Sequence, residues 1–304
     1  MQETTICGGI KVSRLILGLM RIHEKPIEQI EELLKKSIQL GIRLYDIADI
    51  YGNGKCESML GEIFDKNPLM RDKMFIQTKC DICNGYYDCS KEHIIQSVDR
   101  SLARMRTQYV DLLLLHRPDI LMNYKEVAET MIQLFNEGKV HYFGVSNFPS
   151  HQIKMLQKEL PFKLYINQIE MSIVHCPMID SVLHFNTQSE FACDRTYQTF
   201  EYCQEENIQI QAWSPLQISL SEGSFIGNEK YGELNQKLNE LAEKYNTTPH
   251  SIAINWLLKV PGNIQPVIGT TNAIHLEEIC GAMNYELTRP EWYSLYTAAH
   301  KFLP

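Results

Sequence analysis

Residues 26–51 read PIEQIEELLKKSIQLGIRLYDIADIY, and this stretch decides the fold. Proline suits the first turn of a helix and glycine its C-terminal cap, so Pro26 and Gly41 bracket a predicted helix over Ile27–Leu40. The short, mostly apolar run Arg43–Asp49 then predicts a buried strand. The stretch is therefore one helix that leads directly into one strand, with polar side chains where the strand ends.

The same kind of strand recurs along the chain, and helical patterns separate most of the copies. The runs are continuously apolar rather than alternating, which is typical of parallel strands covered by helices. With Arg43–Asp49 there are eight, the others being Leu15–Leu19, Met74–Lys79, Tyr109–His116, Val140–Ser146, Leu164–Glu170, Ile208–Ser214 and Gln265–Thr270. Further helices are predicted over Ser90–Met105, Lys125–Glu137, from Ser150, and over Thr196–Glu206, Gly232–Tyr245, Pro249–Lys259, Ile274–Met283 and Pro290–His300.

Eight alternating strand and helix units predict an α/β fold, the (β/α)8 or TIM barrel, with extra helices late in the chain. No linker rich in proline, glycine or serine divides the sequence, so residues 1–304 are predicted to form a single domain. An open doubly wound sheet is the alternative. The absence of a G-x-G-x-x-G turn disfavours its dinucleotide-binding version.

Composition restricts the class of protein without indicating its chemistry. The net charge of −8 and the dispersed lysines and arginines disfavour nucleic-acid binding. Apolar runs are much shorter than the ~20 residues of a membrane helix, and we expect no signal peptide and no membrane partner. Nine cysteines cannot all pair, which favours a reducing compartment. We expect a cytoplasmic protein; a monomer is compatible with the sequence, which leaves the oligomeric state open.

Polar residues at the C-terminal ends of barrel strands are candidates for function. Asp46 and Tyr51 follow the second predicted strand, Lys79 ends the third and His116 ends the fourth. Each residue alone has an ordinary structural explanation. Together they suit proton transfer, because an ammonium lowers the pKa of a neighbouring phenol, which is ordinarily about 10, and a carboxylate holds the ammonium in place.

Several motifs extend this set over most of the chain. Residues 41–52 read GIRLYDIADIYG and are followed by Glu57 and Gly61. Shorter matches are QTK at 77–79, DLLLLHRPD at 111–119, GVSNF at 144–148, NQIE at 167–170 and AWSPL at 212–216. In this order, from about Ile16 to Ile279, the sequence resembles the aldo-keto reductase family.

The resemblance implies an oxidoreductase that transfers hydride from a nicotinamide cofactor to an aldehyde or ketone. It makes Tyr51 the general acid, Lys79 the group that lowers the pKa of Tyr51, and Asp46 the partner of Lys79. His116 orients the carbonyl, and Met20 lies where the family has a substrate-pocket residue. The implied cofactor contacts are Gly18, Leu19, Asp46, Ser146, Asn147, Gln168, Trp213, Ser214, Leu216, Gly269, Thr270, Thr271, His275 and Glu278.

The choice between NADPH and NADH stays open at two positions. Family members usually place lysine or arginine after the eighth strand, where they bind the 2′-phosphate of NADP. This sequence has Gly269 and His275 there. Hydroxyls and backbone N–H groups at a helix N-terminus can also hold a phosphate. The resemblance implies NADPH as the cofactor, and NADH use is the alternative.

Parts of the sequence also fit other interpretations. A cofactor-binding, redox-sensing regulatory subunit with slow turnover would share the fold and the motifs. A lyase or isomerase acting on a phosphorylated substrate would need a metal cluster or a glycine-rich phosphate loop near the last strands, and none is evident. Cys80 and Cys83 have redox-motif spacing, with Cys89 and His93 nearby, but no second C-x-x-C exists, so no metal site is predicted. The unpatterned stretch 175–195 is expected to be a long loop that covers the active site, with His175, Cys176 and Tyr197 at the border of the substrate pocket.

Overall fold

The computed structural model describes residues 1–304 and contains a closed barrel of eight parallel strands. In order around the barrel these are β12, β3, β4, β5, β6, β7, β8 and β9. Their bounds are β3 (Ile16–Gly18), β4 (Leu44–Asp46), β5 (Phe75–Cys80), β6 (Val110–Leu115), β7 (Val140–Ser146), β8 (Leu164–Glu170), β9 (Gln209–Trp213) and β12 (Gln265–Ile268). The predicted (β/α)8 barrel and all eight predicted strands are confirmed, β7 and β8 with the predicted bounds.

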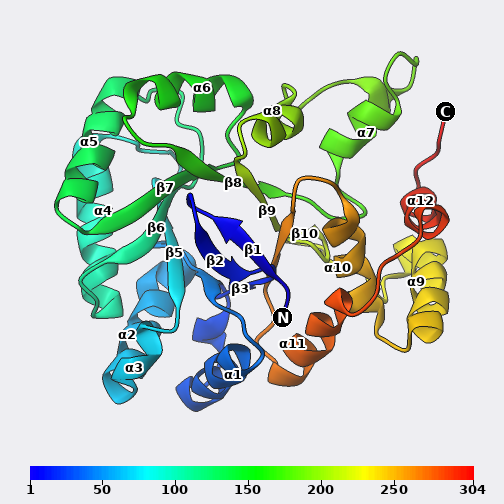
Figure 1. The fold of residues 1–304 in the computed structure, drawn as a ribbon, viewed down its shortest axis with the longest axis horizontal. Helices are drawn as coiled ribbons and strands as arrows, with labels where there is room; N and C mark the ends of the chain where they lie inside the picture. The colour runs from blue at the N-terminus through cyan, green and yellow to red at the C-terminus, as the bar shows by residue number, and fades with distance from the viewer.

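Helices surround the barrel, as Figure 1 shows, and most lie in the crossovers between consecutive strands. The helices expected over Gly232–Tyr245 and Pro249–Lys259 form with those bounds. The full set is α1 (Ile27–Gln39), α2 (Lys55–Lys66), α3 (Pro68–Arg71), α4 (Lys91–Met105), α5 (Tyr124–Asn136), α6 (Ser150–Glu159), α7 (Pro177–Leu183), α8 (Thr199–Glu205), α9 (Gly232–Tyr245), α10 (Pro249–Lys259), α11 (Ala273–Cys280) and α12 (Arg289–Ala298).

The main hydrophobic core has 72 buried residues, and a separate hairpin covers one end of the barrel. This hairpin pairs β1 (Glu3–Ile6) with β2 (Ile10–Ser13) and lies in front of the barrel in Figure 1. Its Ile6 and Val12 form a small buried cluster with residues at the N-terminal strand ends, including Ile16 and Leu44. The hairpin therefore covers the end of the barrel opposite to the candidate site.

Helix α2 packs unusually closely on α4. A Cβ atom on Gly61 of α2 would lie 2.1 Å from the backbone oxygen of Arg104 in α4. No side chain fits there without backbone movement, so this position requires glycine. The contact fixes the helix that follows the tight turn Tyr51–Gly54, in which Gly52 and Asn53 both have positive φ.

The stretch 175–195 is not the open loop that was expected. It contains α7 and a short turn of helix over Glu190–Ala192, because Pro177 can begin a helix and Met178 and Ile179 are buried. Asp180 of α7 accepts hydrogen bonds from Tyr296 of α12, at 2.9 Å, and from Lys301, at 2.8 Å. These contacts connect α7 to the C-terminal segment.

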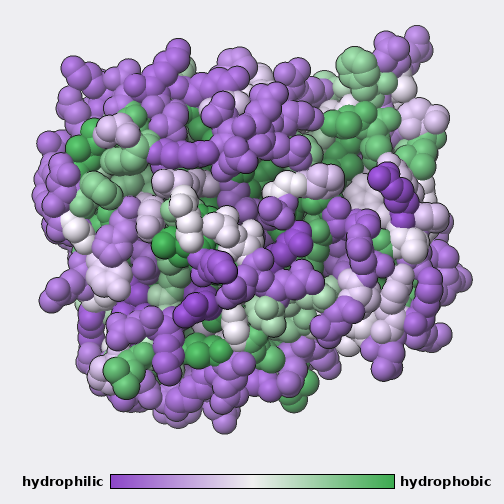
Figure 2. All heavy atoms as spheres, in the orientation of Figure 1, coloured by the Kyte–Doolittle hydropathy of each residue, from purple (hydrophilic) through white to green (hydrophobic).

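The surface in the view of Figure 2 is mainly hydrophilic, with small separate hydrophobic areas, one of them beside α7. None of the helices combines the length and the apolar character that spanning a membrane requires.

Candidate active site

The four residues expected to handle protons lie on three adjacent strands, at the C-terminal end of the barrel. Asp46 is the last residue of β4, Lys79 lies near the end of β5, and His116 directly follows β6. Tyr51 comes from the turn after β4. The barrel thus brings together residues that lie up to 70 positions apart in the chain.

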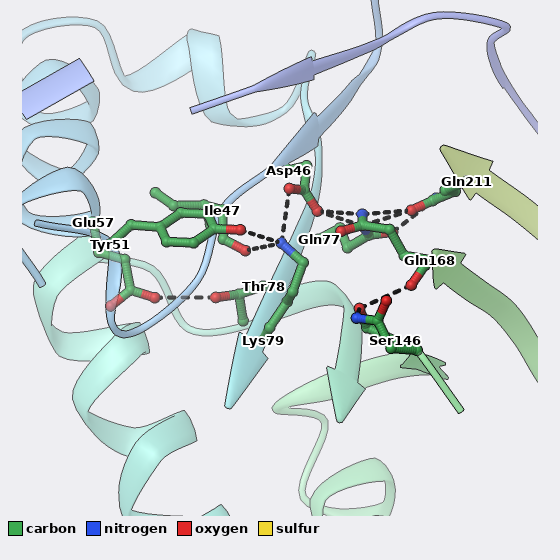
Figure 3. A network of polar contacts seen from close by, with 11 residues as sticks. Asp46, Ile47, Tyr51, Glu57, Gln77, Thr78, Lys79, Ser146, Gln168 and Gln211 are labelled. Carbon is green, nitrogen blue, oxygen red and sulfur yellow. Dashed lines mark hydrogen bonds and ion pairs between the residues drawn. The ribbon is translucent and has the colours of Figure 1, made fainter. Parts of the chain in front are cut away.

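Lys79 is the centre of this group, and Figure 3 shows its contacts. Its side chain is fully buried, and its Nζ donates to Asp46 Oδ2 at 2.7 Å, to the Ile47 carbonyl oxygen at 3.0 Å and to Tyr51 Oη at 3.1 Å. An ammonium has three N–H donors, and all three are used here. Because Tyr51 Oη accepts one of them, its own proton remains free to be donated to another group.

The acidity of Tyr51 differs from the expectation. Burial raises the pKa of its phenol, and this effect outweighs the ammonium of Lys79, which lowers it; Asp46 adds a smaller increase. The predicted lowering by Lys79 is thus present as a contribution, but the net direction in this structure is upward. Tyr51 is therefore protonated throughout the neutral range, which is the form that a general acid needs.

His116 is held in its neutral form. Burial, then the charges of Lys79 and Arg117, keep the pKa of its imidazole well below the ordinary value of 6.5. Its Nδ1 is buried and has no hydrogen-bond partner, and its ring meets that of Tyr51 edge to face at 5.9 Å between centroids. A neutral imidazole at this position can hydrogen-bond a carbonyl group without competing for the proton of Tyr51.

A buried network of three glutamines extends from Asp46 across the barrel interior (Figure 3). Asp46 Oδ1 accepts Nε2 of Gln77 at 2.5 Å and Nε2 of Gln168 at 2.8 Å. Gln211 Oε1 accepts the same two nitrogens at 2.8 and 2.9 Å, and its own Nε2 donates to Gln77 Oε1 at 2.9 Å. Each Asp46 oxygen thus has its own partners, which fixes the carboxylate plane.

Gln168 was predicted from the sequence as a site residue, whereas Gln77 and Gln211 were not. Both residues interrupt apolar strand runs, Met74–Lys79 and Ile208–Ser214, at positions that face the barrel interior. A polar side chain in such a run needs a buried partner. Two such glutamines on different strands were the signal that could have indicated the network.

Replacing Gln211 with methionine tests the network. Met has a similar volume but no amide, so Gln77 and Gln168 would each lose an acceptor. Leaving a buried polar group without its partner costs ~1–3 kcal/mol, and we expect a loss of at least about 2 kcal/mol in the free energy of unfolding. Urea denaturation measures it, with Gln236→Met on the exposed face of α9 as the control. Equal stability of the two variants would contradict the role of Gln211.

The residues expected to contact the nicotinamide lie on the next strands around the barrel. Ser146 ends β7 and donates through Oγ to the Gln168 carbonyl oxygen of β8 at 2.9 Å. Asn147 Nδ2 donates to Ser146 Oγ at 3.0 Å, and Asn147 Oδ1 accepts Nε1 of Trp213 on β9 at 3.1 Å. These bonds hold the half-buried Trp213 indole in one orientation, with the Arg117 guanidinium 5.7 Å from its ring centroid.

Gln168 is more constrained than the resemblance implied. Its amide nitrogen is already bound to Asp46 and Gln211, so only its Oε1 is available to a ligand. It can accept a hydrogen bond from a carboxamide NH2 group but cannot donate one without leaving the network.

The other expected cofactor contacts lie at or after the ends of β3, β9 and β12. Gly18 and Leu19 are buried at the end of β3, with Met20 half-buried beside them, and Ser214 and Leu216 follow β9. The segment after β12 leads into α11, whose first N–H groups are capped by Asn272 Oδ1. Gly269, Thr270, Thr271, His275 and Glu278 are exposed or half-buried there, at the barrel mouth or on α11.

Arg21 is a basic residue at this place that the sequence analysis did not single out. It follows β3, is exposed, and its Nη2 donates to the Gly269 carbonyl oxygen at 3.3 Å. A Cβ atom on Gly269 would lie 3.2 Å from the same nitrogen. Position 269 therefore has no cation of its own but does have one beside it, contributed by a segment about 250 residues away in the chain.

A family model described as the aldo/keto reductase family matches residues 14–298. The chain belongs to the aldo/keto reductase family. Among its relatives, it is 32% identical to the oxidoreductase YdhF of Escherichia coli, with 98% of each chain covered, and 32% identical to the uncharacterized oxidoreductase YcsN of Bacillus subtilis, with 99% of each covered. A 6-dehydroglucose reductase of Agrobacterium fabrum is also 32% identical over 98% of each chain.

A solved structure agrees with this assignment. The thermostable aldo-keto reductase Tm1743, crystallised with the inhibitor epalrestat, matches with a TM-score of 0.77 and 25% identity, over 98% of this chain and 100% of that one. Family membership supports carbonyl reduction as the general chemistry of this aldo/keto reductase and a nicotinamide compound as its cofactor.

The residues present fit such a cofactor. The mouth divides into two continuous arcs, with the residues for proton transfer on β4, β5 and β6, and the candidate cofactor contacts other than Asp46 on or after β7, β8, β9, β12 and β3. The second arc offers an aromatic face, amide and hydroxyl groups, and a capped helix N-terminus with an arginine nearby. This donor set suits a flat carboxamide ring at one end and phosphate at the other.

Proposed function

We propose that this aldo/keto reductase reduces an aldehyde or ketone to an alcohol with NADPH, and that Tyr51 is the proton donor. The observation that carries the proposal is the use of all three Lys79 donors, one of them on Tyr51 Oη at 3.1 Å. Because Tyr51 accepts from Lys79, the hydroxyl proton is directed elsewhere. A substrate carbonyl oxygen at the mouth is the group that would receive it.

Each residue of the site has its own role in the proposed reaction. The bound nicotinamide supplies the hydride. Tyr51 donates its proton to the oxygen that becomes the alkoxide, and Lys79 stabilises the phenolate that remains. Asp46 keeps Lys79 charged and in place through the 2.7 Å contact. Neutral His116 hydrogen-bonds the carbonyl and orients it, and Trp213 supports the ring that delivers the hydride.

The substrate is proposed to be a small carbonyl compound. The relatives include proteins named 6-dehydroglucose reductase and glyoxal reductase, so oxidised sugars and dicarbonyls belong among the first compounds to test. The decisive experiment measures NADPH oxidation over aldehydes, ketones, quinones and oxidised sugars, with Tyr51→Phe as the blank. Tight cofactor binding without turnover of any compound would contradict the proposal and favour a regulatory role.

NADPH is proposed as the preferred cofactor because of Arg21. Its guanidinium lies beside Gly269, in the segment where the family usually has basic residues, and it is held there by the Gly269 carbonyl. A guanidinium can bind phosphate through two parallel hydrogen bonds, which the imidazole of His275 cannot do. The net charge of −8 makes such local attraction necessary for any anionic ligand.

Titration of the intrinsic tryptophan fluorescence tests this preference. We expect NADPH to bind more tightly than NADH, and Arg21→Gln to weaken NADPH binding roughly 10-fold or more, because a hydrogen bond to a charged group contributes about 1.5–3 kcal/mol. NADH binding should change much less. Arg195→Gln serves as the control, because Arg195 is an exposed arginine in the connection between α7 and α8. Equal binding of both cofactors by the wild-type protein would overturn the preference.

We also propose a cytoplasmic location. All nine cysteines are free, five of them among the core-forming residues Cys56, Cys80, Cys89, Cys176 and Cys203. Free thiols in this number suit a reducing compartment.

A further inference from the structure

We propose that Cys83, Asp88 and His93 form a binding site for Zn²⁺, separate from the residues assigned to carbonyl reduction. The three lie where the connection from β5 enters α4, on the segment that follows Lys79. One possible ligand atom from each lies within 4.8 Å of the other two. Cys80 and Cys89, the other cysteines of this segment, are buried and do not belong to the cluster.

The distances require only small shifts to close around an ion. Cys83 Sγ lies 3.9 Å from Nδ1 and 3.8 Å from Nε2 of His93, and His93 Nδ1 lies 3.8 Å from Asp88 Oδ2. Tetrahedral zinc with bonds of about 2.0–2.3 Å places its ligand atoms roughly 3.3–3.7 Å apart. Thiolate, imidazole and carboxylate are all zinc ligands, whereas Ca²⁺ and Mg²⁺ prefer oxygen alone. The half-buried Cys83 leaves a fourth position open to water.

Each ligand is held so that its binding atom faces the others. Asp88 Oδ1 accepts the Ser90 backbone N–H at 2.9 Å, which leaves Oδ2 facing His93. Cys83 lies in a tight hairpin, with its N–H bonded to the Tyr86 carbonyl oxygen at 2.9 Å and Ile82 bridged to Tyr87. The backbone therefore holds both residues before any ion binds.

Ser97 supplies the outer contact that metal-binding histidines usually have. Its buried Oγ lies 3.3 Å from His93 Nε2, and Arg100 donates to the same oxygen at 2.9 Å. In the tautomer in which Nε2 donates to Ser97, the lone pair of His93 is on Nδ1, the nitrogen that lies 3.8 Å from Asp88 Oδ2. Arg100 is bound to Ser97 and not to a ligand atom.

The cluster joins two local structures, since Cys83 lies in the hairpin and His93 lies in the first turn of α4. A divalent ion would balance the thiolate and the carboxylate, and it would fasten the hairpin to the first turn of α4.

Metal titration of the untagged, chelator-treated protein tests the site. We expect one Zn²⁺ per chain in competition with a chromophoric chelator, and Co²⁺ in its place should show tetrahedral d–d bands and a near-ultraviolet thiolate-to-cobalt band. Cys83→Ser should remove the thiolate band. His93→Gln should weaken Zn²⁺ binding at least 10-fold, and Ser97→Ala about 10-fold, because outer contacts contribute this much to metal affinity.

Cys193→Ser is the matched control, since Cys193 is exposed and lies outside the cluster. It should leave both the stoichiometry and the cobalt spectrum unchanged. Circular dichroism of each variant verifies that it is folded. The proposal is overturned if the wild-type protein binds no stoichiometric Zn²⁺, if Cys83→Ser binds Co²⁺ with the thiolate band intact, or if Cys193→Ser loses binding as well.

Discussion

Tyr51→Phe is expected to eliminate carbonyl reduction while NADPH still binds with unchanged affinity. The substitution removes only the hydroxyl that accepts from Lys79 at 3.1 Å and carries the proton for the substrate. General acids contribute roughly 10²–10⁴-fold to rate, so the loss corresponds to about 3–5 kcal/mol of transition-state stabilisation. The measurement is kcat from NADPH oxidation, together with a fluorescence titration of NADPH binding.

Tyr165→Phe is the matched control for this variant. Tyr165 lies near the start of β8, at the opposite end of the barrel from the candidate site, and packs edge to face on Tyr142. It should retain wild-type turnover. Turnover of Tyr51→Phe within a few-fold of wild type would remove Tyr51 from the role of proton donor and leave the fold assignment untouched.

Lys79→Met is expected to reduce kcat by roughly 10²–10³-fold at neutral pH. Lys79 is one of the charges that lower the pKa of Tyr51, so without it the phenol becomes a still weaker acid. The substitution also leaves Asp46 buried without its cation. Breaking such a pair costs about 3–5 kcal/mol, so a lower free energy of unfolding is expected as well.

The pH profile distinguishes loss of acidity from loss of folding. His116 is kept neutral by burial, by Lys79 and by Arg117, and removal of Lys79 raises the pKa of His116 toward its ordinary value. As the pH falls, a growing fraction of His116 in Lys79→Met becomes able to donate a proton. The ratio of wild-type to variant kcat should therefore shrink toward low pH. A constant ratio across the pH range would contradict the role given to Lys79.

A second variant controls for stability. Asp46→Asn combined with Lys79→Met removes both charges and leaves an amide that can still accept from Gln77 and Gln168. Urea denaturation should show that the double variant regains part of the lost free energy of unfolding. Its turnover should remain low, because the ammonium beside Tyr51 is still missing.

The fold was predictable because the same pattern, a short apolar strand run, occurs eight times along the chain. Each of the eight apolar runs contains a strand of the barrel. The largest differences between predicted and observed bounds are at strand ends: β4 stops at Asp46, whereas the predicted strand extends to Asp49. The hairpin β1–β2 was missed because its strands have four residues each and too few buried positions to form a pattern. Helix α7 is seven residues long, too short for helical periodicity to be recognised.

The site was predictable only as a set of positions. Residues at strand ends must converge in a barrel, so Asp46, Tyr51 and Lys79 could be grouped before any coordinates. The effect of these residues on one another's pKa could not be predicted, since the pKa of Tyr51 depends on how deeply the phenol is buried. The pairing of Arg21 with Gly269 depends on barrel closure between β12 and β3, which no local pattern records.

The two arcs of the barrel mouth have a consequence for inheritance. The proton-transfer residues lie in one segment, Asp46 to His116, whereas the candidate cofactor residues are spread from Gly18 to Glu278. Exchange of this one segment between related genes would therefore transfer all four proton-transfer residues together. No single segment would transfer the cofactor contacts, because they come from both sides of the closure between β12 and β3.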